Sequence, residues 1–517
     1  MKLRPVFALL ASAATSTAIV AGCGSDDSSG SKVAELAPAG VPIFAEAALQ
    51  PASELKANTD AAAQKIAGVD DLGALIVEEL ESAAADEGEP VDFEGEVEPW
   101  LGEHGAAYWD SGDTDEANLI VETEDVDLTQ EFIDHQVEQS KDAYESKSYE
   151  GVDYVFGGED ERAIGVVGDF LLATEGEARF KQAVDASESG ESLAAEDTFA
   201  KAIGAASEGS LLDVYIDVGK LLEESDDRID PQARQILRNA GIDPSEATAV
   251  AGVVPGSDQV TVEFSSDLAG QEAPTGDASE LLGELPGNAF AAFAVSGFGD
   301  QVKQAIDALD EEGIPDTVPP GQLKKGLKQL GIDLEQLSGS LRDAGAFAVG
   351  GNEKSLGGAL VLTTSGSQAV ATVDNIVKLL RSVNVSGVSV LGGKYSGFSV
   401  RSDDLGDKPL VVAAKEGRIA IGYGTAPTLN GLLSGSGKAK TLSENAAYDD
   451  AVAALGDTPI GGFADGPAAL RLADALIPKS DEGFEDAKKY LKSVRFLALG
   501  SATQDELATA KLIVGLK

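Results

Sequence analysis

The residue types that perform most enzyme chemistry are scarce in this chain. Its 517 residues include one cysteine, Cys23, and two histidines, His104 and His135. No thiol follows Cys23, which excludes disulfides, thiol catalysis and cysteine-ligated metal sites in the rest of the chain. Neither histidine belongs to a complete nucleophile motif or to a His-Glu-x-x-His run. We therefore expect no catalytic, cofactor-binding or metal-binding residue, and we expect both histidines to be surface or structural groups.

Cys23 follows a segment with the features of an export signal. Lys2 and Arg4 give a positive start, and the apolar stretch after them is short and rich in small residues. Val20-Ala21-Gly22-Cys23 resembles the bacterial lipobox, with valine where leucine is commoner. In a lipobox the cysteine thiol takes a diacylglycerol and becomes the new N-terminus after cleavage. The pattern predicts a signal peptide at 1–22, lipidation of Cys23, and a flexible tether over 23–34.

Three partial motifs favour structural roles over catalysis. Ser53 and Lys56 have the Ser-x-x-Lys spacing of penicillin-recognising enzymes, but the companion Lys-Thr-Gly strand is missing, so we expect a helix N-cap at Ser53. The stretch 431–438 resembles a phosphate-binding loop but has Ala439 where Ser or Thr would meet magnesium. The acidic stretch 110–116 lacks the regular calcium-loop frame, so a hairpin turn is preferred over a cation site.

Two further pairs of residues carry structural expectations. Trp100 and Trp109 are the only tryptophans, and core packing is favoured over a sugar- or protein-binding patch, with exposure as the deciding observation. Asp217 and Asp465 each follow an expected strand and precede an expected helix. We expect each to cap the helix after it, because an aspartate oxygen accepts hydrogen bonds from the free amides of a first turn.

The chain is strongly acidic. It has 38 basic and 89 acidic residues and a formal net charge of −51. Repulsion of this size opposes binding to phosphate polyanions, so nucleic acid is not expected as a partner. The acids are spread along the chain, which favours a solvated acidic surface, with divalent-cation binding or a cationic partner as alternatives.

An internal repeat divides the chain in two. Pro38 and Pro286 are 248 residues apart, and the same spacing separates Asp217 from Asp465. Phe199 and Tyr448 differ by 249, and Tyr149 and Tyr395 by 246. A period this long is the length of a whole domain. We expect a first repeat at 35–267, a linker at 268–283 and a second repeat at 284–517.

Each repeat has the pattern of an α+β domain. Alternating apolar runs predict strands, and tight turns between many of them predict antiparallel hairpins. Amphipathic helices are expected between the strands, at 128–144 in the first repeat and 368–383 in the second. The fold class is therefore α+β, with two tandem homologous domains that each pack helices against a mainly antiparallel sheet.

The Leu36-Ala37-Pro38-Ala39-Gly40 opening, the Tyr-x-Gly hairpins and Val97-Glu98-Pro99-Trp100-Leu101-Gly102 resemble the bacterial domain of unknown function 3352 family over most of the chain. The resemblance implies a secreted or membrane-attached envelope protein and no reaction. Together with the signal, it leads us to expect a lipid-anchored protein on the extracytoplasmic face of the cell membrane. Its expected role is non-catalytic binding or structure, and its partners are the membrane and an envelope protein or hydrophobic ligand. The alternatives are a lipid carrier, which needs an apolar cavity, and a hydrolase that uses carboxylates, which needs two converging acids with separated pKa values.

Overall fold

The structure is a computed structural model, and it describes most of the chain after the N-terminal segment. The described residues are 31–517 without 87–90, 113–116, 141–142, 159–160, 205–208, 225–246, 268–275, 314–318, 330–332, 366, 384–386, 392–394, 416, 425–431, 434–439 and 505–506. The predicted signal peptide at 1–22 and the predicted lipidation site Cys23 lie outside the described residues.

The chain forms two compact units. Unit 1 comprises Met1–Gln271 with Asp505–Thr509, and unit 2 comprises Glu272–Gln504 with Ala510–Lys517. Each unit combines helices with antiparallel strands, which confirms the α+β class. The domain boundaries drawn from the sequence stay predictions. The end of the predicted linker, however, is part of a folded element, because α9 (Ser279–Glu284) buries Leu281 and Leu282 in the core of unit 2.

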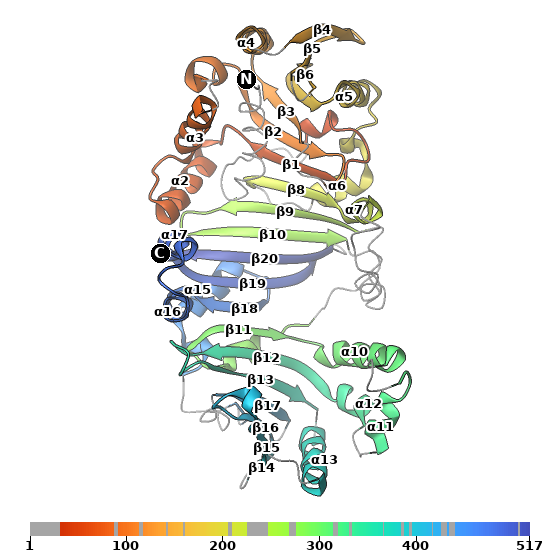
Figure 1. The fold of residues 1–517 in the computed structure, drawn as a ribbon, viewed down its shortest axis with the longest axis vertical. Helices are drawn as coiled ribbons and strands as arrows, with labels where there is room; N and C mark the ends of the chain where they lie inside the picture. The colour runs from red at the N-terminus through yellow and green to blue at the C-terminus, as the bar shows by residue number, and fades with distance from the viewer. Residues whose placement is uncertain are drawn as a thin grey trace. The chain divides into compact units, whose positions relative to one another are not determined.

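Ten strands of unit 1 pair in one antiparallel series (Figure 1). The order is β4 (Tyr144–Tyr149), β5 (Val152–Gly157), β6 (Arg162–Val167), β7 (Phe170–Glu175), β3 (Asn118–Thr123), β2 (Leu101–Trp109), β1 (Ile43–Ala48), β8 (Leu212–Asp217), β9 (Thr248–Pro255) and β10 (Gln259–Asp267). Because neighbouring strands run in opposite directions, short hairpins make most of the connections.

Side chains alternate between the two faces of this sheet. On one face, called here the Phe44 face, Phe44, Tyr108 and Tyr215 pack in a core with α5 (Glu177–Ser189) and α6 (Asp197–Ile203). The opposite Trp109 face packs against α4 (Val126–Gln139). Trp100 and Trp109 are 1% and 3% exposed, so the expectation of core packing for both tryptophans is confirmed.

Unit 2 repeats this strand order (Figure 1). The order is β14 (Val388–Val390), β15 (Ser396–Val400), β16 (Leu410–Lys415), β17 (Arg418–Tyr423), β13 (Gly357–Thr364), β12 (Leu341–Val349), β11 (Ala289–Val295), β18 (Ile460–Asp465), β19 (Val494–Gln504) and β20 (Leu507–Leu516). Its helices include α10 (Phe298–Glu312), α12 (Leu334–Ser338), α13 (Gln368–Val383), α15 (Ala446–Leu455), α16 (Gly466–Leu476) and α17 (Glu482–Leu491).

The strand ladders relate the two units residue by residue. Tyr215 of β8 lies opposite Phe44 of β1, and Phe463 of β18 lies opposite Ala292 of β11. Both positions differ by 248 residues between the units, which is the spacing of the sequence repeat. A rare contact outside the sheets also recurs, because isolated bridges join Pro38 to Ser192 and Pro286 to Thr441.

Aromatic packing follows the same relationship. The ring of Phe199 lies 5.1 Å from that of Tyr215 with an interplanar angle of 79°. In unit 2 the ring of Tyr448 lies 5.4 Å from that of Phe463, also at 79°. Edge-to-face pairs of this kind stabilise a core beyond their burial alone. Phe199 and Tyr448, which are 249 residues apart, therefore make equivalent aromatic contacts in the two units.

One repeat anchor is out of register. Val155 pairs with Ile164, and the corresponding pair in unit 2 joins Phe398 to Val412. This places the second copy of β5 243 residues after the first, whereas Tyr149 and Tyr395 are 246 apart. The two tyrosines are therefore not equivalent. The connection from β15 to β16 is longer than that from β5 to β6, since the paired residues Phe398 and Val412 are 14 positions apart and Val155 and Ile164 are 9 apart.

Helix boundaries were predicted with mixed success. The structure confirms the helix at Gln368–Val383. The helix expected at 128–144 instead ends at Gln139, and Tyr144 begins strand β4. The sequence of β4, Tyr-Glu-Ser-Lys-Ser-Tyr, has no apolar run, and its six residues all pair with β5. Strand β4 therefore forms because its backbone pairs with β5, and not because its side chains are hydrophobic.

Candidate functional site

The two histidines lie beside different carboxylates. His104 Nδ1 in β2 is 3.5 Å from Glu46 Oε1, and His135 Nδ1 in α4 is 3.4 Å from Glu96 Oε1. The structure does not bring the two histidines into one site. Each is part of a local polar contact of its own, consistent with a structural or surface role.

The Ser-x-x-Lys spacing belongs to an ordinary surface helix. Helix α2 (Ser53–Ala67) has Ala52 at its N-cap, so the N-cap predicted at Ser53 is wrong by one residue. Lys56 Nζ lies 3.2 Å from Asp60 Oδ2 and 3.0 Å from Asp71 Oδ2. These bonds raise the pKa of Lys56, so it is held as a cation and is unsuited to act as a base.

Two other predicted motifs have different outcomes. Asp217 Oδ1 accepts from the amide of Lys220 at 2.9 Å, and Asp465 Oδ1 accepts from the amide of Ala468 at 2.7 Å, as expected of helix caps. The loop 431–438 lies outside the described residues except for Leu432 and Leu433, and both of these are buried.

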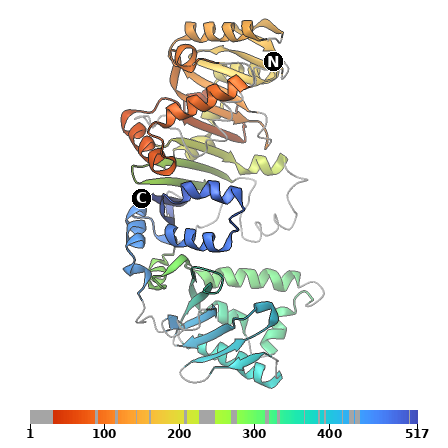
Figure 2. The same cartoon turned by 60° about the vertical axis from the view of Figure 1, so that its left-hand side comes forward.

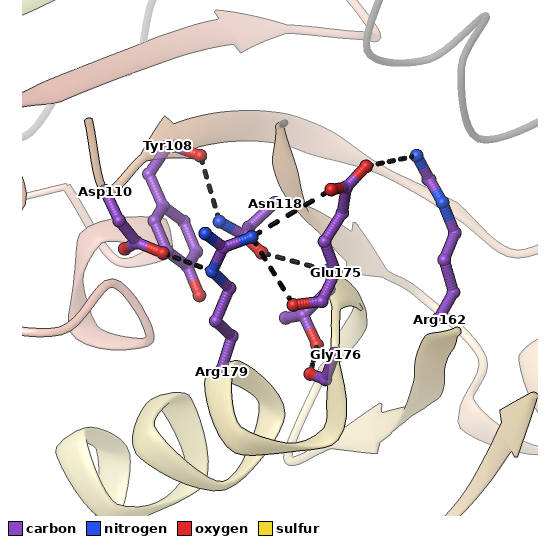
Figure 3. A network of polar contacts seen from close by, with 8 residues as sticks. Tyr108, Asp110, Asn118, Arg162, Glu175, Gly176 and Arg179 are labelled. Atoms are coloured by element: carbon purple, nitrogen blue, oxygen red, sulfur yellow. Dashed lines mark hydrogen bonds and ion pairs between the residues drawn. The ribbon is translucent and has the colours of Figure 1, made fainter. Parts of the chain in front are cut away.

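A polar network of unit 1 joins two arginines to two acids (Figure 3). Arg179, in the first turns of α5, lies between Asp110 and Glu175, with Nε 2.6 Å from Asp110 Oδ2 and Nη1 3.9 Å from Glu175 Oε2. On its other side Glu175 meets Arg162, whose Nη2 is 3.1 Å from Glu175 Oε1. Asn118 completes the network, because its Oδ1 accepts the amide of Glu175 at 3.1 Å.

Burial makes this network sensitive to change. Arg162 is 8% exposed, and its Nε and Nη1 atoms have no hydrogen-bond partner in the described part of the chain. Tyr108 is fully buried, and burial next to Asp110 raises the pKa of its phenol far above the usual range. A buried guanidinium held mainly by one carboxylate is destabilised if that carboxylate is lost.

Unit 2 has apolar residues at the corresponding ladder positions. Tyr108 and Asn118 are paired in unit 1, and Phe347 and Ala359 are paired in unit 2. Arg162 pairs with Glu175 in the β6–β7 hairpin, and the matching pair in β16–β17 is Leu410 with Tyr423. The same fold is therefore built without the ion pair, and the network is a specialisation of unit 1.

A second cluster of polar residues forms a row across neighbouring strands on the Phe44 face of unit 1. Glu46 of β1 lies opposite Asp213 of β8, and His104 and Glu122 continue the row on β2 and β3. Glu122 Oε2 accepts the amide of His104 at 3.1 Å. The row thus places three carboxyl groups and one imidazole on neighbouring strands.

Burial raises the pKa of two acids of this row. It raises the pKa of Asp213 to about 7, and the charge on Glu46 contributes to that rise. It also raises the pKa of Glu46 itself. The hydroxyl of nearby Ser210 donates to the Leu212 carbonyl at 3.0 Å, and Asp213 Oδ1 has no donor among the described residues. A contact with Ser210 lowers the pKa of Asp213, but burial outweighs it, because a carboxyl group removed from water retains its proton more strongly.

The matching row of unit 2 has lost most of these charges. Ala294 and Gly461 stand 248 residues after Glu46 and Asp213. Thr363 takes the place of Glu122, since its Oγ1 accepts the amide of Asp343 at 2.9 Å as Glu122 accepts that of His104. The backbone contact persists, whereas the positions of Glu46, Asp213 and Glu122 carry no acid in unit 2 and an acid, Asp343, stands at the position of His104. The fold itself therefore does not require the three acids of unit 1.

This geometry brings two buried carboxyl groups together. Burial raises the pKa of both Glu46 and Asp213, and the charge on Glu46 adds to the rise at Asp213. No group of three His, Cys, Asp or Glu side chains arranged to hold a metal ion occurs among the described residues. The row can hold a proton near neutral pH, because burial raises the pKa of Asp213 to about 7.

The sequence analysis did not single out the charged residues of these clusters. Glu46, Glu122 and Asp213 alternate with apolar residues in the strands, so they lie on the face that carries the core. A charged residue at an inward-facing strand position is the available signal. Arg162 and Glu175 give the same signal, because they are charged residues at the open end of a largely apolar hairpin.

The fold and its polar clusters define an acidic α+β protein whose two units share one strand order. The chain belongs to the family described as "Protein of unknown function (DUF3352)", whose model matches residues 76–514. No curated protein matches it. A solved structure titled "Structure of crystal form III of TP0453" aligns over 46% of this chain and 81% of its own, with 9% identity and a TM-score of 0.25. None of the described helices is long and apolar enough to cross a membrane.

Proposed function

We propose that this protein is a lipid-anchored component of the cell envelope, held on the extracytoplasmic face of the membrane, with a binding or structural role and no catalysis. The observation that carries the anchor is Cys23 at the end of a complete export signal, in Val20-Ala21-Gly22-Cys23. Two or more acyl chains hold a protein stably at a bilayer, whereas one chain holds it only marginally.

The use made of buried charge supports the non-catalytic part of the proposal. The charged side chains of the unit 1 network form ion pairs with one another: Arg162 with Glu175, and Arg179 with Asp110. Unit 2 forms the same hairpin with Leu410 and Tyr423 in place of Arg162 and Glu175. Catalytic side chains have to contact a substrate, whereas these side chains contact other residues of the protein.

Cys23→Ser tests the anchor. In the native host, the wild-type protein is expected in the membrane fraction and the variant in the soluble extracytoplasmic fraction. Mass spectrometry of the wild-type N-terminal peptide should show a lipid-modified cysteine. Ser28→Ala, which leaves the lipobox intact, is the matched control and should stay with the membrane. An unmodified wild-type cysteine, or a variant that remains equally membrane-bound, would contradict the proposal.

A further inference from the structure

The first described residues of unit 1 form a short segment that packs on the sheet. Ser31 comes shortly before the 3-10 helix η1 (Val33–Glu35), which contacts β2 and β3. Three apolar side chains of this stretch are at most 3% exposed and belong to the core of the Phe44 face: Val33, Ala34 and Leu36. We call residues 31–36 the N-terminal segment.

Ser31 connects this segment to the pair of acids on β1 and β8. Its hydroxyl accepts the amide of Ala34 at 3.2 Å and forms a hydrogen bond with the carboxyl group of Glu46. Strand β1, drawn in red, lies inside the sheet of unit 1 with β2 and β8 on its two sides (Figure 2), and Asp213 of β8 is directly opposite Glu46. The N-terminal segment therefore contacts one of two neighbouring carboxyl groups.

The surroundings of this pair favour its protonated form. The side chain of Glu46 is 18% exposed, and burial raises its pKa although contacts with Ser31 and His104 act in the opposite direction. On β9, a Cβ placed on Gly252 would lie 2.8 Å from Asp213 Oδ1, so the carboxyl group of Asp213 fills the space over that glycine. The other described titratable or charged groups around the pair are His104 on β2, Glu122 on β3, Glu263 opposite Gly252 on β10, and the exposed Lys32 and Glu35 of the N-terminal segment.

Docking of the N-terminal segment and protonation of the pair are linked. Like charges directly opposite each other on neighbouring strands repel, so ionisation of both carboxyl groups is unfavourable. Release of the segment admits water to Glu46, and water stabilises a carboxylate better than an apolar core does. The docked arrangement thus binds protons more tightly than the released one. By linkage, protons favour docking, and a rise in pH weakens it.

Unit 2 has a corresponding segment that lacks the acids. Ser279 stands 248 residues after Ser31 and begins α9, which packs in the core of unit 2. Its hydroxyl donates to the carbonyl of Ile460 at 3.4 Å, and a backbone carbonyl does not titrate in this pH range. The positions of the acid pair are Ala294 and Gly461. The two segments therefore dock in a similar way, but only that of unit 1 contacts a group that ionises.

We infer that Glu46 and Asp213 form a proton-controlled latch, which holds the N-terminal segment on unit 1 while the pair keeps a proton and releases the segment when both carboxyl groups ionise. The chain after the segment stays fixed, because the amide of Leu193 donates to the carbonyl of Ala37 at 2.8 Å. Release adds residues 31–36 to the free chain before unit 1, a length of up to about 20 Å. With the proposed lipid anchor, on which this consequence rests, the latch would set how far unit 1 reaches from the bilayer.

Hydrogen–deuterium exchange of the full-length Cys23→Ser protein tests the latch without lipidation. Exchange is read by mass spectrometry at about pH 5 and about pH 8, on either side of the raised pKa of Asp213, and is corrected for the intrinsic rate at each pH. Peptides that cover 31–36 should lose about tenfold or more in protection at the higher pH, since one unit of pKa shift corresponds to a factor of ten. Peptides that cover 279–284 are the internal control and should change far less. Glu46→Gln with Asp213→Asn should abolish the loss, because neither amide ionises.

Three outcomes would overturn the inference. The first is a change in protection of equal size at 31–36 and 279–284, or no change at 31–36. The second is protection of 31–36 equal to that of β6 and β7 at both pH values, which would mean that the whole unit unfolds and no local release occurs. The third is a loss of protection that persists in the double variant and disappears in His104→Gln, which would assign the effect to the imidazole.

Thermal unfolding shows whether the double variant is folded. If it is not, Glu46→Ala with Asp213→Gly, which installs the residues of unit 2, takes its place and should likewise abolish the loss of protection. Failure of the proposed anchor is seen separately, in the fractionation of the wild-type protein, because the exchange experiment contains no lipidated cysteine.

Discussion

Glu46 in β1 lies directly opposite Asp213 in β8, and burial raises the pKa of both carboxyl groups. The pKa of Asp213 rises from an ordinary 3.8 to about 7. Between these values the folded state binds more protons than the unfolded state does. The free energy of unfolding that depends on Asp213 is therefore highest in acid and is lost as the pH rises through about 7.

Asp213→Asn should remove this pH dependence. Relative to wild type, the variant is expected to gain about 2 kcal/mol or more in unfolding free energy between about pH 5 and about pH 8, because only the wild type must ionise a buried group. Any fixed cost of burying the amide appears equally at both pH values and cancels. Chemical denaturation at the two pH values measures the gain, and Asp153→Asn on the exposed side of β5 is the control. A gain that does not change with pH would show that Asp213 is not held neutral by burial.

Breaking the Arg162–Glu175 pair from one side should be costly. Glu175→Gln leaves the buried guanidinium of Arg162 without its carboxylate, and we expect a loss of about 3 kcal/mol in unfolding free energy. The double variant Arg162→Leu, Glu175→Tyr installs the residues that unit 2 has at these positions and should recover most of that loss. Asp450→Asn, which breaks the exposed pair with Arg495, should cost less than about 1 kcal/mol. A double variant no more stable than the single one would mean that the charges are needed for the fold of unit 1.

Phe199 and Tyr448 should have equal importance in their own units. Each is buried and packs edge-to-face on an aromatic residue of the eighth strand of its unit. Phe199→Ala and Tyr448→Ala should each cost about 3–5 kcal/mol by leaving a cavity. Calorimetry of the two variants measures this, with Tyr490→Ala as a control at an exposed aromatic residue. A negligible cost at one position would contradict the equivalence of the two contacts.

Local patterns in the sequence were enough to predict much of the fold. Gln368–Val383 has helical periodicity throughout, and its helix has those bounds. Asp217 and Asp465 cap helices because the required donors are the amides a few residues ahead. The family assignment follows from motifs such as Val97–Gly102, and the family match over 76–514 agrees with it.

The tertiary structure alone decided which polar residues share a site and which strand pairs with which. Glu46 and Asp213 are far apart in the chain, and only the β1–β8 ladder brings them together and removes them from water. Strand β4 forms although its residues have no apolar pattern, because β5 satisfies its backbone. The sequence by itself determined the repeat and the α+β class, since these depend on composition, spacing and local hydrogen bonds, and the export signal stays a prediction from the sequence. Long-range pairing and burial depend on the whole chain, and they alone set the registers, the buried ion pair and the raised pKa values.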